Sequence, residues 1–441
     1  MGMEHLTTAD IGHWGTGWAP GLEELALPWT CPSSPGPLAL TGGVTIVSAP
    51  EDDLRYPRLV RFSDSAGTDA ARHPEQDGLP AMMAAAFCGG DAGLAVRPFG
   101  SGNINRTYLV MPGQGDRPPF LLQCLNTEVF RQPELVAANI REVLGHVAAN
   151  LAAPDGRVVG RWELPEVLLT TEGRDHVVAP DGTWWRAQRF ISGTRTVDRV
   201  EDPGIAREVG RGLGCFHRLV ADLPVSGLAD TLPGFHVTPG YLARYDMVRE
   251  GLPESGNSEE RWCHDFIGRH RHVAPMLEDA LAEGRLRIRP IHGDPKVNNI
   301  LLDEGTGAAV AVIDLDTVKP GLLHYDLGDC LRSSCNPAGE EPADPGAVRF
   351  DLDLARAVLE GYMGVAGAVL GPADRDLIPA SARLLAFELG LRFFTDHLEG
   401  DVYFRVEERG LNLRRARVQF RLADAIEARF DDLAAIVREC A

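Results

Sequence analysis

The spacing of apolar residues changes near residue 200 and divides the chain into a strand-rich part and a helix-rich part. Between residues 94 and 193, short apolar runs alternate with Gly, Pro and Asp, the pattern of strands joined by tight turns. After residue 200, helical segments dominate. The expected strands are 94–100, 106–113, 119–126, 164–173, 175–182 and 184–193, and the expected helices after residue 200 include 201–223, 241–252 and 261–284.

Helical spacing also occurs within the strand-rich part. The stretch AMMAAAFCGG (81–90) predicts a short helix that two glycines end. Residues 133–151 predict an amphipathic helix, because their apolar residues recur at helical spacing. These apolar positions are Leu135, Ile140, Val143, Leu144, Val147 and Leu151. The pattern therefore predicts an α+β protein of two lobes, with a small β-rich N-lobe at 81–192 and a larger, mostly helical C-lobe at 193–441.

Residues 1–80 follow neither periodicity. They are rich in Pro, Gly, Ser and Asp, so we expect a flexible N-terminal extension with at most a short hairpin around TGGVTIVSA (41–49). The chain has 441 residues, which agrees with more than one compact unit.

Composition narrows the class of protein. The formal net charge of −20 disfavours nucleic acid and anionic membrane surfaces as partners, because both would repel an acidic surface. The eight cysteines are scattered without zinc-like spacing, which favours reduced thiols. We find no signal peptide and no apolar run of the roughly 20 residues that a membrane helix needs, and we therefore expect a cytoplasmic protein. The oligomeric state stays open.

The stretch IHGDPKVNNILLD (291–303), followed by AVAVIDLD (309–316), carries the strongest chemical signal. Phosphoryl transfer needs a carboxylate beside the acceptor hydroxyl, and Asp294 is the candidate base. It also needs oxygen ligands for Mg²⁺ against the nucleotide phosphates, and Asn299 and Asp314 are the candidate ligands. Lys296 could steady the transferred phosphoryl group. The role of Asp316 stays open: it either takes part in this site or is an ordinary hydrogen-bonded loop carboxylate.

A glycine-containing loop precedes this motif in the strand-rich part. In FGSGNINRTYLV (99–110), Gly100 and Gly102 would let backbone N–H groups approach phosphate oxygens. The same residues could form a hairpin turn without function. Their position before the aspartate motif favours the nucleotide-binding interpretation.

Several stretches resemble one family. IHGDPKVNNILLD with VIDLD resembles the active-site signature of the aminoglycoside phosphotransferase and choline kinase superfamily, which has a protein-kinase-like fold. GNINRTYLV, LLQCLNTEVFRQPELVAANI, RAQRFISGTRTVD and DTVKPGLLHYDLGDC resemble its other conserved blocks. LRFFTDHLEGDVYF (391–404) is similar to a block of the N-acetylhexosamine 1-kinase-like branch. The resemblance spans roughly residues 90–425.

The resemblance implies an enzyme that uses ATP and Mg²⁺ to phosphorylate the anomeric hydroxyl of a free hexose such as N-acetylglucosamine or N-acetylgalactosamine. Asp294 would contact that hydroxyl, and Asn299 and Asp314 would hold the metal. The nucleotide would contact the loop and the hinge, and the sugar would contact two further segments. The implied nucleotide-binding residues are Gly100, Ser101, Gly102, Asn103 and Gln188, and the implied sugar-binding residues are Asp294, Ile104, Arg392 and Tyr403.

One position departs from the family pattern. A Lys or Arg is expected after Gln123, where a cation would reach the nucleotide phosphates, but the chain has Cys124. Arg106 replaces the family's acidic residue on the neighbouring strand. We therefore hypothesise that Arg106 supplies the missing charge. The alternatives are weakened ATP binding or a changed phosphoryl donor.

Three functions stay open at this level. The first is a sugar 1-kinase. The second is a phosphotransferase of the same fold that acts on another small alcohol, such as an aminoglycoside, a choline-like amine or another sugar. The third is a nucleotide-binding module without activity, which Cys124 suggests and which the retained Asp294, Asn299 and Asp314 oppose.

Overall fold

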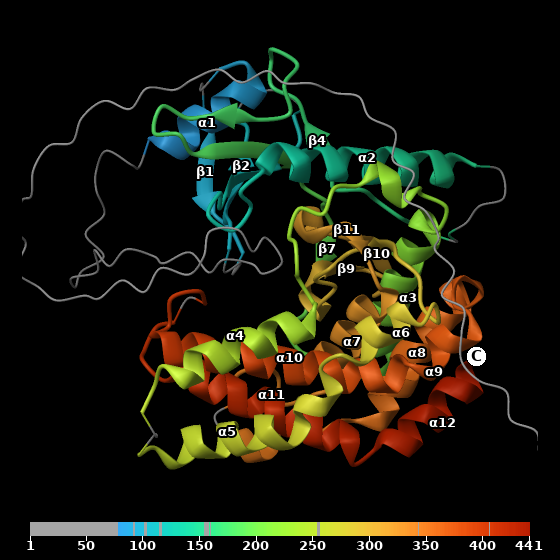
Figure 1. Ribbon diagram of the computed structural model, residues 1–441. Coiled ribbons are helices and arrows are strands. Elements are labelled where there is room, and N and C mark those ends of the chain that lie inside the picture. Colours follow the sequence, from blue (N-terminus) through green and yellow to red (C-terminus); the bar gives the residue numbers. More distant parts are fainter. Residues whose placement is uncertain are drawn as a thin grey trace, which may run out of the picture. The chain divides into compact units, whose positions relative to one another are not determined.

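The computed structural model describes residues 78–90, 93–100, 104–113, 117–153, 158, 160–253, 256–342, 344–404 and 406–441. The expected extension 1–80, apart from its last three residues, lies outside the described part, as does the hairpin expected near residues 41–49. Figure 1 follows the described chain from α1 (Leu79–Cys88) to α12 (Phe430–Cys440).

The first part of the described chain forms one antiparallel sheet in the order β1-β2-β3-β6-β4, with β5 also paired to β6. Its strands are β1 (Ala95–Pro98), β2 (Arg106–Met111), β3 (Phe120–Leu125), β4 (Val167–Leu168), β5 (Val177–Val178) and β6 (Trp184–Arg189). The strands expected at 164–173 and 175–182 are much shorter than predicted, because the turn between them closes on itself through a bond from the Thr170 N–H to the Arg174 carbonyl.

Helix α1 packs against one face of this sheet. Its Met83 and Phe87 share a buried cluster with side chains from β2, β3 and β6. The predicted glycine stop is confirmed: Gly89 adopts φ 76°, a left-handed conformation that glycine takes without strain, and its N–H caps the carbonyl of Ala85.

Helix α2 (Pro133–Ala152) begins with a proline, which fits the first turn of a helix because its missing N–H has no partner there. Its apolar face, including Val136 and Ile140, joins the main core. The buried Asn139 donates from Nδ2 to the carbonyls of Ala229 and Val318, at 2.9 Å each. A buried amide therefore fixes α2 against loops of the helical part.

Two small sheets lie within the second part of the chain. One has the order β10-β9-β7 and the other pairs β11 with β8, both antiparallel. Their strands are β7 (Thr194–Arg195), β8 (Arg289–Ile291), β9 (Ile300–Asp303), β10 (Ala309–Val312) and β11 (Lys319–Gly321). The loops that follow β8 and β10 carry the aspartate motif.

The helices of the second part build the main core, and α3 and α8 approach each other most closely where glycines face the partner helix. A Cβ on Gly210 of α3 would lie 1.9 Å from the Val358 carbonyl oxygen, so any larger residue would separate the two helices. The helices are α3 (Pro203–Val220), α4 (Thr238–Glu250), α5 (Ser258–His270), α6 (Met276–Ala282), α7 (Leu323–Ser334), α8 (Leu352–Ala366), α9 (Pro372–Asp376), α10 (Ile378–Glu399), α11 (Leu411–Glu427) and α12 (Phe430–Cys440).

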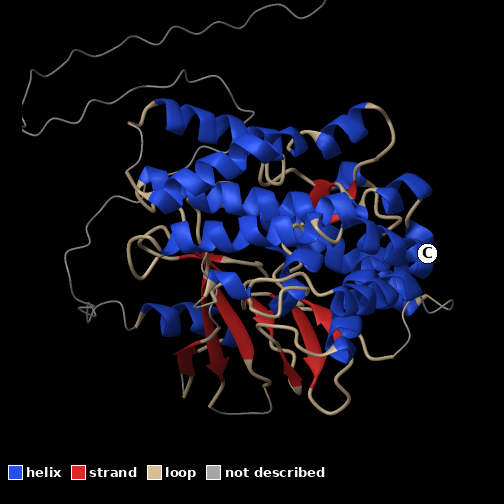
Figure 2. Ribbon diagram, turned by 90° about the horizontal axis from the view of Figure 1, so that it is seen from below, coloured by secondary structure: helices blue, strands red, loops and turns tan. Residues whose placement is uncertain are grey.

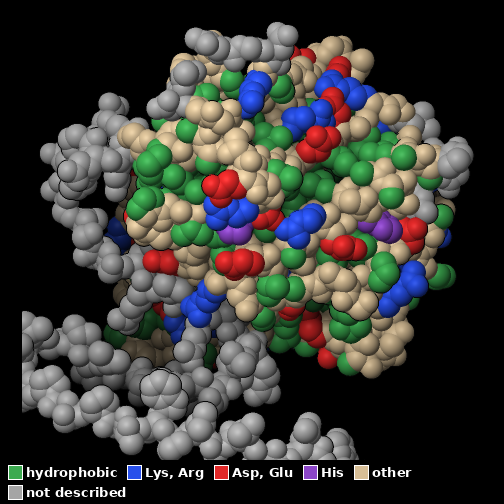
Figure 3. All heavy atoms as spheres, turned by 90° about the horizontal axis from the view of Figure 1, so that it is seen from above, with side chains coloured by type: hydrophobic (Ala, Val, Ile, Leu, Met, Phe, Trp, Pro, Cys, Tyr) green, Lys and Arg blue, Asp and Glu red, His purple; other side chains and the backbone are tan. Residues whose placement is uncertain are grey.

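The predicted fold class is confirmed. In Figure 2 most strands lie in the lower half and most helices in the upper half, and in sequence a β-rich N-terminal part is followed by a mostly helical part. The exact lobe boundaries at residues 80 and 192 stay a prediction. On the face shown in Figure 3, basic and acidic side chains are interspersed. No helix in the described ranges has both the length and the apolar character needed to cross a membrane.

Candidate active site

The loop that carries Asp294 follows β8 directly. Gly293 adopts φ 87°, and a Cβ there would lie 2.6 Å from the Thr317 carbonyl oxygen, so this position requires glycine. The buried His292 donates from Nε2 to the Ile313 carbonyl at 2.9 Å, and its own carbonyl accepts a bond from the Thr317 hydroxyl at 2.7 Å. The loop after β8 is thus bonded to the loop after β10.

Asp326, in the first turn of α7, binds the backbone of this loop. Its carboxylate accepts bonds from the backbone N–H groups of His292 and Gly293, at 2.6 and 2.8 Å. His217 of α3 donates to the same carboxylate at 2.8 Å. Burial alone would raise the pKa of Asp326, but the bond from His217 and the neighbouring imidazoles keep it below its usual value. A fully buried anion therefore organises the backbone beside Asp294.

A second buried group supports the same loop. His236 donates from Nε2 to the Gly293 carbonyl at 2.7 Å and from Nδ1 to Glu388 at 2.9 Å. Burial alone would lower the pKa of His236, but Glu388 and the bond to Gly293 raise it. The Thr238 hydroxyl donates to the other oxygen of Glu388 at 2.8 Å.

Asp294 lies at the open end of this loop with its carboxylate partly exposed. Lys296 donates to the carboxylate at 2.7 Å. The attraction of Asp294 raises the pKa of Lys296 above its usual value. Asn299, in the short turn Val297–Asn299, donates from Nδ2 to the Asp294 carbonyl at 2.8 Å. The motif residues that the sequence singled out thus lie together.

Asp314 follows β10 in a left-handed conformation (φ 63°), directly after Ile313, whose N–H bonds to the Asn299 carbonyl at 2.9 Å. Burial, and then repulsion from Asp316, raises the pKa of Asp314 to about 6. A cation beside Asp314 would relieve that cost. A carboxylate and an amide oxygen suit Mg²⁺, which usually takes few protein ligands and completes its shell with phosphate and water. The donor set of Asn299 and Asp314 therefore fits Mg²⁺.

Asp316 connects this loop to the first sheet. Arg186 of β6 forms a buried ion pair with Asp316, the two side chains being 3% and 2% exposed. Asn105, just before β2, donates to the other oxygen of Asp316 at 2.6 Å. Arg186 also donates to Oε1 of Gln123, from Nε at 3.0 Å and from Nη2 at 2.8 Å. Asp316 is thus an acceptor that bridges the two parts of the chain.

The hypothesis that Arg106 replaces a cation lost at position 124 does not fit the structure. Cys124 is buried in the cluster that faces α1, and Arg106 is its direct partner in the β2–β3 pairing. Residues paired directly across two strands share a face of the sheet, and the Arg106 guanidinium donates to Cys124 Sγ at 3.2 Å. Arg106 therefore lies on the opposite face from Gln123 and Arg186.

The structure describes only some of the other residues that were predicted to contact the nucleotide. Gly100 adopts φ 78°, whereas Ser101, Gly102 and Asn103 lie outside the described residues. Gln188 is buried on β6 two positions after Arg186, so both side chains leave the same face of the sheet.

The predicted sugar contacts come from three segments. Ile104 is partly buried against the main core. The guanidinium carbon Cζ of Arg392, on α10, lies 5.2 Å from the ring centroid of Phe235, 5.1 Å from that of Tyr241 and 5.5 Å from that of Phe404. Tyr403 precedes Phe404 in a loop whose backbone N–H groups bond to Asp396.

The charge of Arg392 also interacts with the aspartate loop. Burial alone would lower the pKa of Arg392, but Tyr241, Tyr403, Glu388 and Asp294 raise it. The arginine is therefore charged, enclosed by aromatic rings, and within electrostatic reach of Asp294.

A family comparison agrees with this geometry. The model of the phosphotransferase enzyme family (APH) matches residues 95–362, which span the first sheet and the aspartate motif and end within α8. The chain belongs to this family. Membership of this family identifies the chain as a phosphotransferase.

Solved structures show the same fold. An aminoglycoside phosphotransferase from Alicyclobacillus acidocaldarius is 15% identical, with a TM-score of 0.56, and the match covers 84% of this chain and 98% of that one. A choline kinase from Cryptosporidium parvum is 14% identical, with a TM-score of 0.51 over 78% of this chain and 91% of that one. A microcompartment-associated aminopropanol kinase is 18% identical, with a TM-score of 0.50 over 78% and 94%. At these identities the likeness concerns the fold alone.

Sequence reasoning missed most of the groups that hold the phosphotransferase motif in place. Local spacing does not reveal Asp326, His217, His236 or Glu388, since each contacts the loop from a distant segment. Arg186 left a visible signal, because it is a basic residue between Trp185 and Ala187 in a buried strand.

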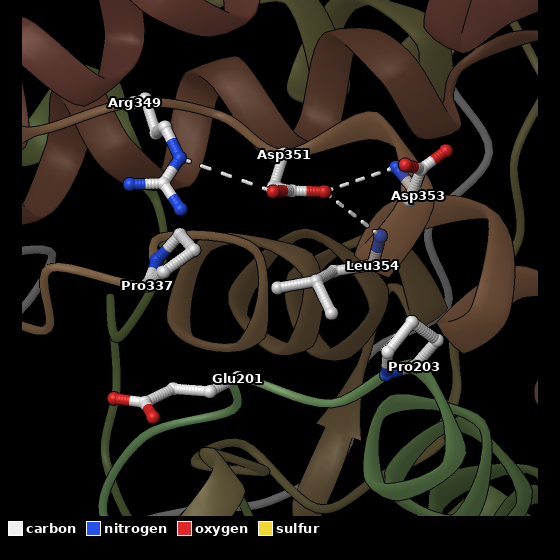
Figure 4. A pocket seen from close by; sticks show the side chains of 7 residues that line it. All are labelled: Glu201, Pro203, Pro337, Arg349, Asp351, Asp353 and Leu354. Atoms are coloured by element: carbon white, nitrogen blue, oxygen red, sulfur yellow. Dashed lines mark hydrogen bonds and ion pairs between the residues drawn. The ribbon is translucent and has the colours of Figure 1, made fainter.

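Figure 4 shows a separate pocket between the starts of α3 and α8 that contains none of the predicted site residues. Asp351 in this pocket caps α8 by accepting bonds from the N–H groups of Asp353 and Leu354, and it lies 3.9 Å from Arg349. The Asp351 carboxylate therefore serves the helix terminus.

Glu278 on α6 gives the site region a measurable pH dependence. Burial raises the pKa of Glu278 to about 7, although the Tyr325 hydroxyl donates to it at 2.8 Å. The folded state binds a proton that the unfolded state loses above its lower pKa, so stability should fall as pH rises through about 4.5–7. We expect Glu278→Gln to unfold like the wild type at pH 5 and to be more stable by about 1–3 kcal/mol at pH 8.

Thermal and urea unfolding at both pH values would measure this difference. Glu283→Gln is the matched control, because Glu283 is an exposed carboxylate at the end of the same helix. A difference between Glu278→Gln and wild type that does not change with pH would contradict the assignment.

Proposed function

We propose that the protein is an ATP- and Mg²⁺-dependent kinase that phosphorylates the anomeric hydroxyl of a free hexose, with N-acetylglucosamine and N-acetylgalactosamine as the leading acceptors. Asp294 would accept the proton of that hydroxyl, and Lys296 beside it would stabilise the negative charge of the transferred phosphoryl group. Asn299 and Asp314 would hold the metal. When bound, Mg²⁺ would neutralise charge on the nucleotide phosphates.

The observation that carries the choice of acceptor is Arg392, whose side chain is 14% exposed and lies among three aromatic rings. A guanidinium held by Phe235, Tyr241 and Phe404 has little freedom left, and it can donate hydrogen bonds to hydroxyl or acetamide oxygens. Tyr403 and Ile104 would add a hydroxyl and apolar contact to the sugar. These groups suit a neutral polyol.

The same arginine disfavours the alternative acceptors. The proteins of similar fold include a choline kinase and an aminopropanol kinase, whose names indicate amine-containing acceptors. Aromatic rings often bind such cations, but the rings around this site are already occupied by Arg392. A cationic acceptor would therefore meet a fixed positive charge. The position of Cys124 also argues against a nucleotide-binding module without activity. Cys124 was the residue that suggested such a module, and it lies on the face of the sheet away from Asp316.

The test is turnover of ATP with Mg²⁺ against N-acetylglucosamine, N-acetylgalactosamine, glucose, galactose, mannose, choline, 1-amino-2-propanol and kanamycin. Phosphorus NMR of the product would identify an anomeric phosphate. We expect turnover on an N-acetylhexosamine, and Arg392→Met should raise the KM for that sugar roughly 10- to 100-fold, the effect of losing charge-assisted hydrogen bonds, with the KM for ATP little changed.

The opposite response would support another acceptor. If Arg392→Met improves turnover of choline or the amino alcohol while the sugars stay inactive, the sugar assignment is wrong. ATP binding without turnover on any acceptor would favour the nucleotide-binding module.

A further inference from the structure

The cation that the sequence lacks after Gln123 has a structural substitute on the neighbouring strand. Arg186 of β6 is the direct partner of Gln123 of β3, and its side chain emerges on the face of the sheet that carries Gln123 and Gln188. Arg186 is 2% exposed, although it carries a permanent charge. Such a residue needs partners for each of its donors.

The guanidinium is only partly satisfied. Its Nε and Nη2 donate to Gln123, and Nη2 also pairs with Asp316. Nη1 is buried and has no hydrogen-bond partner among the described residues. An unpaired buried donor on a charged group is costly, and an anionic oxygen is the acceptor that would recover most of that cost.

The neighbours of Arg186 indicate which anion that is. Asp316 joins it to Asn105, at the end of the glycine-containing loop, and the charge of Arg186 also reaches Asp314. One positive group thus interacts with a carboxylate that binds Asn105 and with the loop expected to hold the metal. Gln123 and Asp316 fix its orientation from two sides, so little side-chain freedom would be lost on binding.

We propose that Arg186 binds the phosphate chain of the nucleotide through Nη1 and takes the place of the basic residue expected on β3. Gln123 and Asp316 act as positioning residues for this guanidinium. This inference rests on the proposed use of ATP, but it is independent of the identity of the acceptor.

The test is nucleotide affinity, measured by calorimetry with ATP, ADP and adenosine in the presence of Mg²⁺. Arg186→Gln should weaken ATP binding roughly 10- to 100-fold, the effect of losing a charge-assisted hydrogen bond, and leave adenosine binding within about twofold. A purely structural role would change both affinities alike. Arg106→Gln, on the opposite face of the sheet, should keep the ratio of ATP to adenosine affinity.

Removing Arg186 leaves Asp316 as an unpaired buried charge, which could prevent folding. The double variant Arg186→Gln/Asp316→Asn avoids this, because no buried charge is left alone in it. The double variant should bind ATP roughly tenfold or more weakly than the wild type, with equal adenosine affinity.

The outcomes separate the two proposals. An unchanged ratio of ATP to adenosine affinity in Arg186→Gln, or in the double variant, would overturn the role of Arg186 while the kinase function stands. A wild type that binds ATP through Arg186 but phosphorylates no hexose would overturn the sugar kinase and keep the phosphate contact. A wild type that binds no ATP would overturn both.

Discussion

Replacing Asp294 with asparagine is expected to lower kcat for phosphoryl transfer roughly 10²- to 10⁴-fold while ATP affinity stays within about threefold. Asparagine has the size of aspartate, and its amide oxygen can still accept the bond from Lys296. It cannot take a proton from the acceptor hydroxyl. The carboxylate is 31% exposed at the end of a loop fixed by Asp326 and His236, so the substitution should change chemistry rather than shape.

Single-turnover kinetics with saturating ATP would measure the chemical step, and calorimetry would measure ATP affinity. Asp279→Asn is the matched control, since Asp279 is an exposed aspartate on α6. We expect its turnover to equal that of the wild type. If Asp294→Asn retains more than about a tenth of wild-type kcat, Asp294 is not the base.

The order of the motif residues could be predicted because it is local. Asp294, Lys296 and Asn299 lie within one loop and turn, and Asp314 ends the next hairpin strand. The hydrogen bond between Ile313 and Asn299 follows from that hairpin pairing. The spacing of these residues in the sequence therefore indicated both the candidate residues and that they lie close together.

The sequence also indicates which face of the sheet each β3 side chain lies on. In FLLQCL, the buried Phe120, Leu122 and Cys124 alternate with Leu121 and Gln123. A period of two places Cys124 on the core face, away from any nucleotide on the other face. The replacement at position 124 therefore has little bearing on nucleotide binding. Gln123 and its partner Arg186 have more, because they lie on the other face of the sheet.

Other contacts are not accessible to local reasoning. Asn139 anchors helix α2 through Ala229 and Val318, which are 90 and 179 residues away in sequence. The rings around Arg392 come from two distant stretches, one with Phe235 and Tyr241 and the other with Phe404. Such groups meet only after the core has formed, so no pattern within one segment identifies them.

Asp326 is the distant contact with the largest expected effect on folding and activity together. Its two carboxylate oxygens accept three bonds, from the N–H groups of His292 and Gly293 and from His217. In Asp326→Asn, one of these oxygens becomes an NH₂ group, which would point a donor at a donor. We expect the free energy of unfolding to fall by about 3–5 kcal/mol at pH 7, as for other broken buried charge networks.

The activity of this variant should fall as well, because the same bonds fix the backbone that presents Asp294. Loss of a positioning group should reduce kcat roughly 10- to 100-fold at a temperature where the variant stays folded, with a small change in ATP affinity. Urea unfolding and steady-state kinetics at low temperature would measure the two effects separately.

Asp329 provides the matched control for the expected loss of stability. It lies one turn later on α7, it is also buried, and it bonds to Arg332 rather than to the catalytic loop. Asp329→Asn should therefore lose stability with kcat largely retained. If Asp326→Asn instead kept wild-type kcat despite its lower stability, the bonds to His292 and Gly293 would serve the core alone. The orientation of Asp294 would then have to come from His236 and Thr317 on the other side of the loop.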